Sequence, residues 1–316
     1  METEIYEKYV NPFTDFGFKR IFGQECSKDL LIDFLNCILG REEDPIEDIV
    51  YSPNEQLAPT TEDRKSVVDI YCQSLKGDRF IVEMQKNRQT YFKDRMVLYA
   101  TYPIVNQAQR GGAWDYRLSA VYIVAIMDFV FPENEDTTDV IHHVKLVELE
   151  NNRVFYDKLT FVYAEMPKFT KKLEELNSNT DKWLYVLKNI SRLQNLPDRL
   201  KNKIFEKFFS IAEISKLTKD EYFTYQASLK AYRDNYAILQ TAILDERDRQ
   251  EKLRQKELQE QETKHKNEMQ KQEAKYQSEM QKQEAKYNQE KLIIASLLLK
   301  QGLTKEQIKG ITGMDL

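Results

Sequence analysis

The stretch between Pro197 and Gly302 contains no glycine and no proline. Because these two residue types interrupt helices most strongly, their absence over such a length permits one very long helix. An eleven-residue repeat lies inside the stretch, as KELQEQETKHK from 256, NEMQKQEAKYQ from 267 and SEMQKQEAKYN from 278, with a degenerate copy, DERDRQEKLRQ, from 245. Eleven residues make about three helical turns, which predicts a nearly straight or slightly right-handed coiled coil.

The apolar stripe of this repeat is thin. It consists of Leu258, Met269, Tyr276, Met280 and Tyr287. Residues 245–291 carry 12 basic and 12 acidic side chains, so the rod has no net charge with which to bind DNA. Two interpretations remain open for this segment: a single solvated helix, or a coiled coil that makes the protein a homo-oligomer.

The end of the chain, from 292 to 316, has a different pattern. The apolar run at 292–299 needs a partner, Gly302 stops the helix, and residues 304–307 have the form of a capping box that opens a short second helix. Two short helices around a glycine turn are similar to part of a helix-turn-helix. Since a third helix is missing, the pattern favours a packing or oligomerisation element over a DNA reader.

A second constrained stretch, residues 65–86, has the pattern of a β-hairpin, with β-branched and aromatic residues around a glycine-containing break at 76–78. A three-residue loop at that break predicts that Asp69 lies opposite Gln85. Side-chain alternation puts Glu83 on the same face. Two acids and an amide on one face of an apolar hairpin are costly unless they face water, pair with other groups or hold an ion.

Helices and strands are predicted around this hairpin in an α/β order. The expected elements are a helix capped by Thr14 and ending at 23, a helix at 27–39 closed by Gly40, a strand at 45–51, a helix at 91–109 ended by Gly111-Gly112, and strands at 117–131, 140–149 and 154–166. From 168 onward the composition turns helical, with two helices broken near Pro197. The first half therefore has the pattern of a mixed α/β domain, and the second half is helical.

The pattern of Asp69 followed by Glu83 and Gln85 resembles the PD-(D/E)XK nuclease superfamily, with Gln in the Lys position. It is most similar to the recombination-promoting nuclease and transposase family. Further similar features are Asp15, Phe18, Lys19 and Phe22 near the N-terminus, Arg95 and Tyr99 four residues apart on one helix, the glycine pair at 111–112, and FVYAEMPKF at 161–169. The resemblance covers roughly the first half of the chain.

This resemblance implies an α/β fold with a PD-(D/E)XK nuclease-like core, in which helices flank a central mixed sheet. We expect this domain at 1–169, a helical subdomain at 170–244, the long charged helix with its repeats at 245–291, and the short helical tail at 292–316.

The resemblance also implies a Mg²⁺-dependent endonuclease that hydrolyses DNA phosphodiester bonds and is linked to recombination or transposition. Asp69, Glu83 and the main-chain carbonyl of Met84 would bind Mg²⁺, an ion that takes oxygen ligands and keeps several waters. The metal would polarise the phosphodiester and lower the pKa of a bound water. The implied catalytic residues are Asp69, Glu83, Gln85, Asp15, Lys19, Arg95 and Tyr99.

Gln85 is the departure from the general superfamily pattern. It carries no charge, although its carbonyl oxygen can still hydrogen-bond a water. Lys86 is expected on the opposite face of the strand and is a poor substitute for the missing lysine. We expect Arg95, or Lys19 if its segment approaches the site, to restore a positive charge near the phosphate.

Composition limits the alternatives. The net charge of -5 gives no global basic signature for nucleic acid. Three cysteines without metal spacing, no signal-peptide pattern and no apolar run of membrane-spanning length predict a cytoplasmic protein that does not enter a membrane.

One alternative is a catalytically weak or inactive nuclease-fold protein that acts as a DNA-binding or assembly scaffold through its coiled coil. Under a second alternative, Asp69 and Glu83 are solvent-facing polar residues of a half-exposed sheet.

Overall fold

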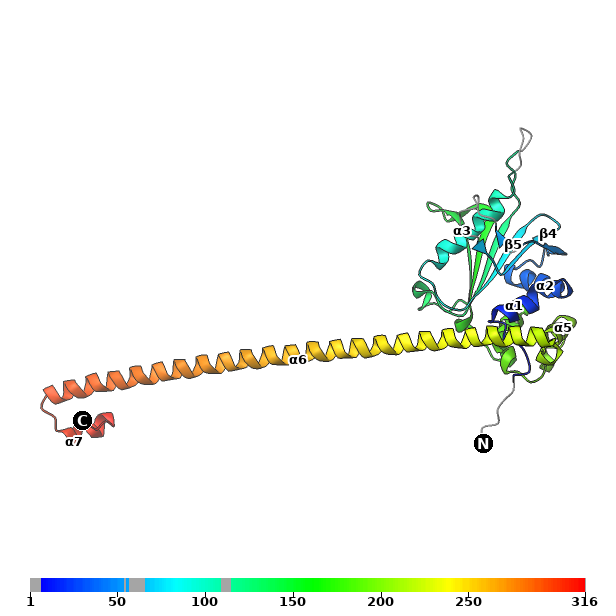
Figure 1. The fold of residues 1–316 in the computed structure, drawn as a ribbon. Coiled ribbons are helices and arrows are strands. Elements are labelled where there is room, and N and C mark those ends of the chain that lie inside the picture. The colour runs from blue at the N-terminus through cyan, green and yellow to red at the C-terminus, as the bar shows by residue number, and fades with distance from the viewer. Residues whose placement is uncertain (1–6, 54, 57–65, 109–114, 316) are drawn as a thin grey trace. The chain divides into compact units, whose positions relative to one another are not determined.

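The computed structural model describes residues 7–53, 55–56, 66–108 and 115–315 (Figure 1). The chain divides into two compact units, Met1–Tyr236 and Ala237–Leu316, which are described separately below. The glycine pair at 111–112, expected to end a helix, and most of the loop that leads to the hairpin lie outside the described residues.

A mixed sheet organises the first unit. Within the described residues it has six strands in the order β1-β4-β5-β6-β8-β7. The strands are β1 (Ile49–Tyr51), β4 (Ile70–Ser74), β5 (Arg79–Gln85), β6 (Val121–Met127), β7 (Ile141–Glu148) and β8 (Arg153–Glu165); β2 (Glu55–Gln56) and β3 (Ser66–Val67) form a separate pair. Strands β5, β6 and β8 run parallel, whereas β4 and β7 are antiparallel to their neighbours. The expected central mixed sheet is confirmed.

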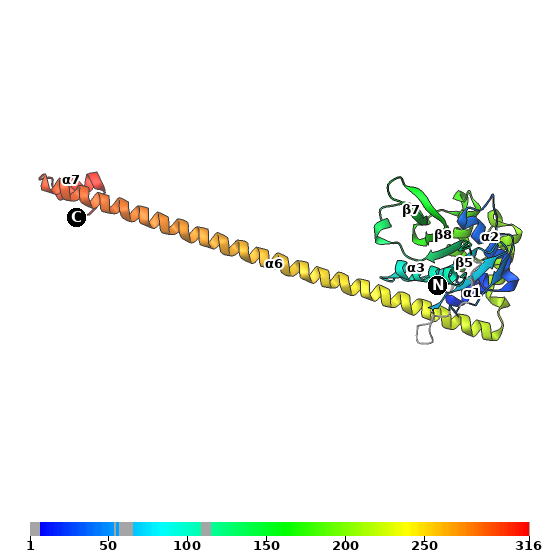
Figure 2. The ribbon, with the colours of Figure 1, turned by 90° about the horizontal axis from the view of Figure 1, so that it is seen from above.

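Helices flank the sheet on both faces (Figures 1 and 2). The α-helices are α1 (Asp15–Phe22), α2 (Lys28–Leu39), α3 (Phe92–Val105), α4 (Asn179–Asn189), α5 (Lys203–Ala212), α6 (Lys219–Lys300) and α7 (Lys305–Thr312). Short 3-10 turns lie at Glu25–Ser27, Pro132–Asn134, Met166–Lys168, Leu173–Glu175, Ile190–Arg192, Asp198–Leu200 and Ile214–Lys216. Buried residues of α3 pack on one face of the sheet, and those of α1, α2, α4, α5 and the first turns of α6 form a core on the other.

Local signals set the ends of the first two helices. The Thr14 hydroxyl accepts a hydrogen bond from the Gly17 backbone N–H at 3.0 Å, which satisfies a donor that the first turn of a helix leaves unpaired. Gly40 ends α2 with a φ of 63°, a left-handed conformation that favours glycine. Both ends agree with the sequence expectation.

The hairpin has a different register from the one expected. Gln73 pairs with Arg79 and Ile70 pairs with Val82, so Asp69 comes next to Glu83 instead of Gln85. The loop occupies 75–77, one residue earlier than predicted, because Ser74 and Asp78 close it. The Ser74 N–H donates to the Asp78 carbonyl at 2.8 Å, and the Asp78 N–H donates to the Ser74 hydroxyl at 3.1 Å. The register shift is two residues, so the predicted faces of the strands do not change.

The helices after the sheet complete the same core as α1 and α2. Trp183 of α4 is 1% exposed and contacts the rings of Phe22, Phe34 and Phe208, which come from α1, α2 and α5. Burial of such large rings is the main source of stability for this face of the sheet. The four expected domain ranges stay predictions, and the core shared by these helices crosses the proposed boundary at 169/170.

The second unit contains the rest of α6 and the short helix α7. Helix α6 continues without a break to Lys300, which the absence of glycine and proline permits. Thr304 caps α7 through the expected capping box with Gln307. Ala295 and Ile308 are buried, one on each helix, so α7 packs against the end of α6. No helix in the described part of the chain is both long and apolar enough to cross a membrane.

Candidate active site

Asp69 and Glu83 meet where β4 begins and β5 approaches its end. The Asp69 backbone N–H donates to Glu83 Oε1 at 3.0 Å, and the Met84 backbone N–H donates to Asp69 Oδ2 at 2.8 Å. Each carboxylate is therefore fixed by the backbone of the other strand. This reciprocal pairing depends on the observed hairpin register, because the expected one would have placed Asp69 beside Gln85.

Burial separates this pair from ordinary surface acids. Glu83 is only 5% exposed, so the interpretation of Glu83 as a solvent-facing residue is wrong. Burial, followed by the negative charge of Asp69, raises the pKa of Glu83 to about 8. Burial also raises the pKa of Asp69, although the hydrogen bond from Met84 opposes the shift. A buried carboxylate whose ionisation a neighbouring carboxylate disfavours forms a site where a cation would be stabilised.

Arg95 of α3 lies between the carboxylates and Gln85, the residue that stands where the superfamily pattern has lysine. Its guanidinium donates to Gln85 Oε1 and to Gln89 Oε1, and its Nη2 lies 4.0 Å from Glu83 Oε2. The Gln85 amide nitrogen donates to the Asn87 carbonyl at 2.8 Å, which fixes the orientation of the amide. Gln85 thus orients a cationic side chain beside the acids, and Arg95 is placed where it can supply the charge that glutamine lacks.

Tyr99 lies under this arginine, one helical turn later. It is 8% exposed, and its ring centre is 5.7 Å from the Arg95 guanidinium carbon. Burial, and then the charge of Glu83, raises the pKa of Tyr99, so the phenol stays protonated at neutral pH. The structure therefore brings Arg95 and Tyr99 together with Glu83 and Gln85.

The N-terminal helix also reaches the site, as its family-like residues suggested. Lys19 Nζ forms an ion pair with Asp15 Oδ1 at 2.7 Å on the surface of α1. The positive charge of Lys19 lowers the pKa of both Asp69 and Glu83, and the negative charge of Asp15 raises that of Asp69. Asp15 and Lys19 therefore act on the carboxylate pair through space.

The donor set suits a hard cation with few protein ligands. The described residues contain no group of three or more His, Cys, Asp or Glu side chains arranged to hold a metal. Two carboxylates plus the Met84 carbonyl need no third side chain, since Mg²⁺ keeps several waters and binds through one or two carboxylates. Both acids have raised pKa values, and the charge of Asp69 contributes to the shift of Glu83; these observations fit a cation at this place.

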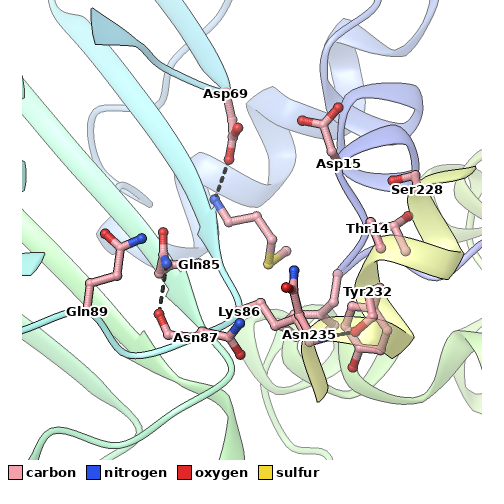
Figure 3. Close-up of a pocket in the computed structure, with 13 residues that line it drawn as sticks. Thr14, Asp15, Asp69, Gln85, Lys86, Asn87, Gln89, Ser228, Tyr232 and Asn235 are labelled. Atoms are coloured by element: carbon pink, nitrogen blue, oxygen red, sulfur yellow. Dashed lines mark hydrogen bonds between the residues drawn. The ribbon is translucent and has the colours of Figure 1, made fainter. Parts of the chain in front are cut away.

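A cavity of about 320 Å³ opens beside Asp69 (Figure 3). One wall comes from the start of α1 and another from the end of the hairpin. The third wall comes from α6: Ser228, Ala231, Tyr232 and Asn235. These four residues were not predicted from the sequence, although their i, i+3, i+4, i+7 spacing marks one helix face. Nothing local connects that face to a hairpin roughly 145 residues earlier, so only the packing of α6 reveals it.

Lys86 also lines this cavity. Its ammonium donates to the Tyr232 carbonyl and lies over the Tyr232 ring. Burial lowers the pKa of Lys86 and raises that of Asp128, whose carboxylate lies 3.5 Å from the Tyr232 hydroxyl. Lys86 is thus tied to α6, and Arg95 is the cation in contact with Gln85.

Comparison with known proteins gives a family for this arrangement. A family model described as PD-(D/E)XK nuclease family transposase matches residues 12–242. The match includes α1, the whole sheet, α3 and the first turns of α6 that line the cavity. No curated protein and no solved structure matches the chain.

Proposed function

Because the chain belongs to the PD-(D/E)XK nuclease family of transposases, we propose that it is a Mg²⁺-dependent endodeoxyribonuclease that hydrolyses DNA phosphodiester bonds in recombination or transposition. The single observation that carries the proposal is the hydrogen-bonded pair of Asp69 and the buried Glu83, with Arg95 beside it. Burial and a neighbouring acid do not raise the pKa of a solvated surface carboxylate in this way, whereas they do so for acids at functional sites.

The chain's own residues divide the work. Asp69, Glu83 and the Met84 carbonyl would hold the metal. Bound Mg²⁺ supplies Lewis-acid polarisation of the phosphate and a water of lowered pKa. Arg95 offsets negative charge that develops on the phosphate, and its hydrogen bond to Gln85 keeps the guanidinium directed at that place.

Gln85 retains a role in this scheme. Its carbonyl oxygen has two lone pairs, so it accepts from Arg95 and can accept from the attacking water as well. A lysine at this position would place a second cation directly beside Arg95. The arginine on α3 thereby explains how this site can function with glutamine on the strand.

Supercoiled plasmid tests the proposal. We expect Mg²⁺-dependent conversion to nicked or linear DNA by the wild-type protein, and loss of at least about a hundredfold in rate in Asp69→Asn and Glu83→Gln. Glu150→Gln, in an exposed turn, is the matched control and should keep full activity. Cleavage that persists in both site variants would refute the assignment of the catalytic carboxylates.

A second proposal concerns assembly and location. The apolar stripe of α6 is exposed, with Met269 at 54%, Tyr276 at 66%, Met280 at 50% and Tyr287 at 58%. We propose that this stripe pairs with the same stripe of a second copy, which makes the enzyme a homo-oligomer through its long helix.

The three cysteines are free thiols, which supports a cytoplasmic protein.

A further inference from the structure

The cavity beside the carboxylates has two chemically different ends. Asp15 and Asp69 lie at one end, and Asn87, Tyr232 and Asn235 lie at the other (Figure 3). The acidic end belongs to the site described above. The amide end is used by none of the proposed steps.

Uncharged hydrogen-bonding groups dominate the amide end. In the part of the chain that the structure describes, the side-chain amides of Asn87 and Asn235 have no hydrogen-bond partner. Each amide offers donors and an acceptor together, the combination that matches the edge of a nucleobase. Lys86 is the one cation among the described residues that line the cavity, and its ammonium already donates to the carbonyl of Tyr232 on α6. An anion is thus poorly matched here, and a neutral polar group is well matched.

Aromatic surface flanks the amides. Phe13, just before α1, and Tyr232 on α6 both line the cavity. Nucleobases stack on aromatic side chains without regard to sequence, and each such contact contributes substantially to binding of unpaired strands. A volume of about 320 Å³ is at the lower end of the range of small-ligand pockets, so the cavity fits a single nucleoside and excludes a base-paired segment.

We propose, on the basis of the proposed nuclease function, that this cavity binds one unpaired nucleoside of the DNA strand beside the phosphate held at Asp69 and Glu83. The base lies between Phe13 and Tyr232 and pairs with the free amides. The protein therefore selects DNA at places where a base is already outside the stack, such as a bulge or a single strand, because extrusion from an intact duplex must first break base pairing and stacking.

Binding without cleavage tests this directly. Fluorescence anisotropy of the Glu83→Gln protein should give about tenfold tighter binding to a duplex with a single-nucleotide bulge than to the fully paired duplex of the same flanking sequence. Asn235→Ala, added to Glu83→Gln, should remove most of this preference. Asn267→Ala is the matched control: it is the same change on the same helix, at an exposed position of the repeat, and should keep the preference.

Asn87→Ala, also added to Glu83→Gln, removes the other amide, which follows the hairpin, and should likewise reduce the preference for the bulged duplex. The conclusion then does not depend on the folding of a single α6 variant. Equal affinity for the two duplexes, or a preference that survives both Asn235→Ala and Asn87→Ala, overturns the nucleoside pocket. Either outcome leaves plasmid cleavage by the wild-type protein intact as support for the nuclease. Absence of both plasmid cleavage and DNA binding would instead overturn the nuclease function and the pocket together.

Discussion

At the scale of single residues, ionising the carboxylates of the site costs folding free energy. Glu83 is almost fully buried beside Asp69, and both have raised pKa values. A carboxyl that the fold prefers to keep neutral destabilises the protein when it must ionise. Proteins retain such unfavourable groups mainly at active sites. The cost therefore fits the proposed metal, because a bound cation would stabilise the ionised carboxylates.

Neutralising Glu83 should therefore stabilise the fold while it removes activity. We expect Glu83→Gln to raise the melting temperature in alkaline buffer without metal, by a few degrees for each kcal/mol gained. Mg²⁺ should raise the melting temperature of the wild-type protein, since a ligand that binds the folded state stabilises it, and should have little effect on the variant. Thermal unfolding with EDTA and with Mg²⁺ measures both effects, and an equal Mg²⁺ shift in the two proteins would argue against Glu83 as a ligand.

Glu165 shows the opposite behaviour. It is 0% exposed at the end of β8, where burial would raise its pKa. Hydrogen bonds from Lys168, the Phe131 N–H, Asn134 and His142 outweigh burial and hold the pKa of Glu165 below its ordinary value. A depressed carboxyl pKa contributes stability above the pKa of the unfolded chain, and this contribution is lost as the pH falls through the folded pKa.

Glu165→Gln should accordingly lose stability at neutral pH, by about 3 kcal/mol or more, since it leaves the nearly buried Lys168 without its anion. The difference between wild type and variant should shrink as the pH falls below about 4, because the wild-type carboxyl then takes up a proton. Urea unfolding at a series of pH values gives this comparison. A difference that is independent of pH would indicate a packing effect instead of an ionic one.

At the scale of elements, the first turns of α6 belong to the nuclease fold. Tyr225 is 0% exposed, and its hydroxyl accepts a hydrogen bond from the Asn11 N–H at 3.0 Å. The Phe16 N–H donates to the Ser228 hydroxyl at 3.2 Å. These contacts dock α6 on the segment that leads into α1, and they place the α6 wall of the cavity.

Truncating that anchor should weaken both the fold and the site. We expect Tyr225→Ala to cost about 3–5 kcal/mol of unfolding free energy, as for other buried aromatic residues. Tyr222→Ala lies on the same helix at 42% exposure and should cost less than about 0.5 kcal/mol. Chemical denaturation measures the unfolding free energy of each variant. A similar loss of unfolding free energy in both would mean that α6 is not anchored by Tyr225.

At the scale of the whole molecule, the proposed assembly uses one face of α6. Positions 258, 269, 276, 280, 287 and 294 fall within roughly 40° of one another around an α-helix, so Ile294 extends the apolar stripe at its C-terminal end. Asn267 and Ser278 lie on the opposite side at the same eleven-residue spacing. They allow a control with equal added charge.

We expect the wild-type protein to have a mass in solution above that of one 37.6 kDa chain. Met269→Lys with Met280→Lys should reduce it to the monomer mass, because two charges enter the seam of each copy. Asn267→Lys with Ser278→Lys should leave the mass unchanged. Analytical ultracentrifugation gives these masses, and a wild-type protein that sediments as a monomer would rule out assembly through the stripe.

Local patterns in the sequence were sufficient to predict the long helix and the helix caps at Thr14 and Gly40. They also predicted that Asp69, Glu83 and Gln85 share one face of the hairpin. These features follow from helix and strand periods and from the absence of helix breakers, which are properties of neighbouring residues. The resemblance added the candidate site residues and the fold, and the fold is confirmed.

The tertiary structure alone decided the hairpin register, the choice of Arg95 as the partner of Gln85, and the cavity wall that α6 contributes. Each of these depends on which surfaces pack together, and packing joins residues far apart in the chain. The burial of Glu83 belongs to the same group. Alternation predicts only the face on which a carboxylate lies, whereas the helix packed over that face decides whether water reaches it.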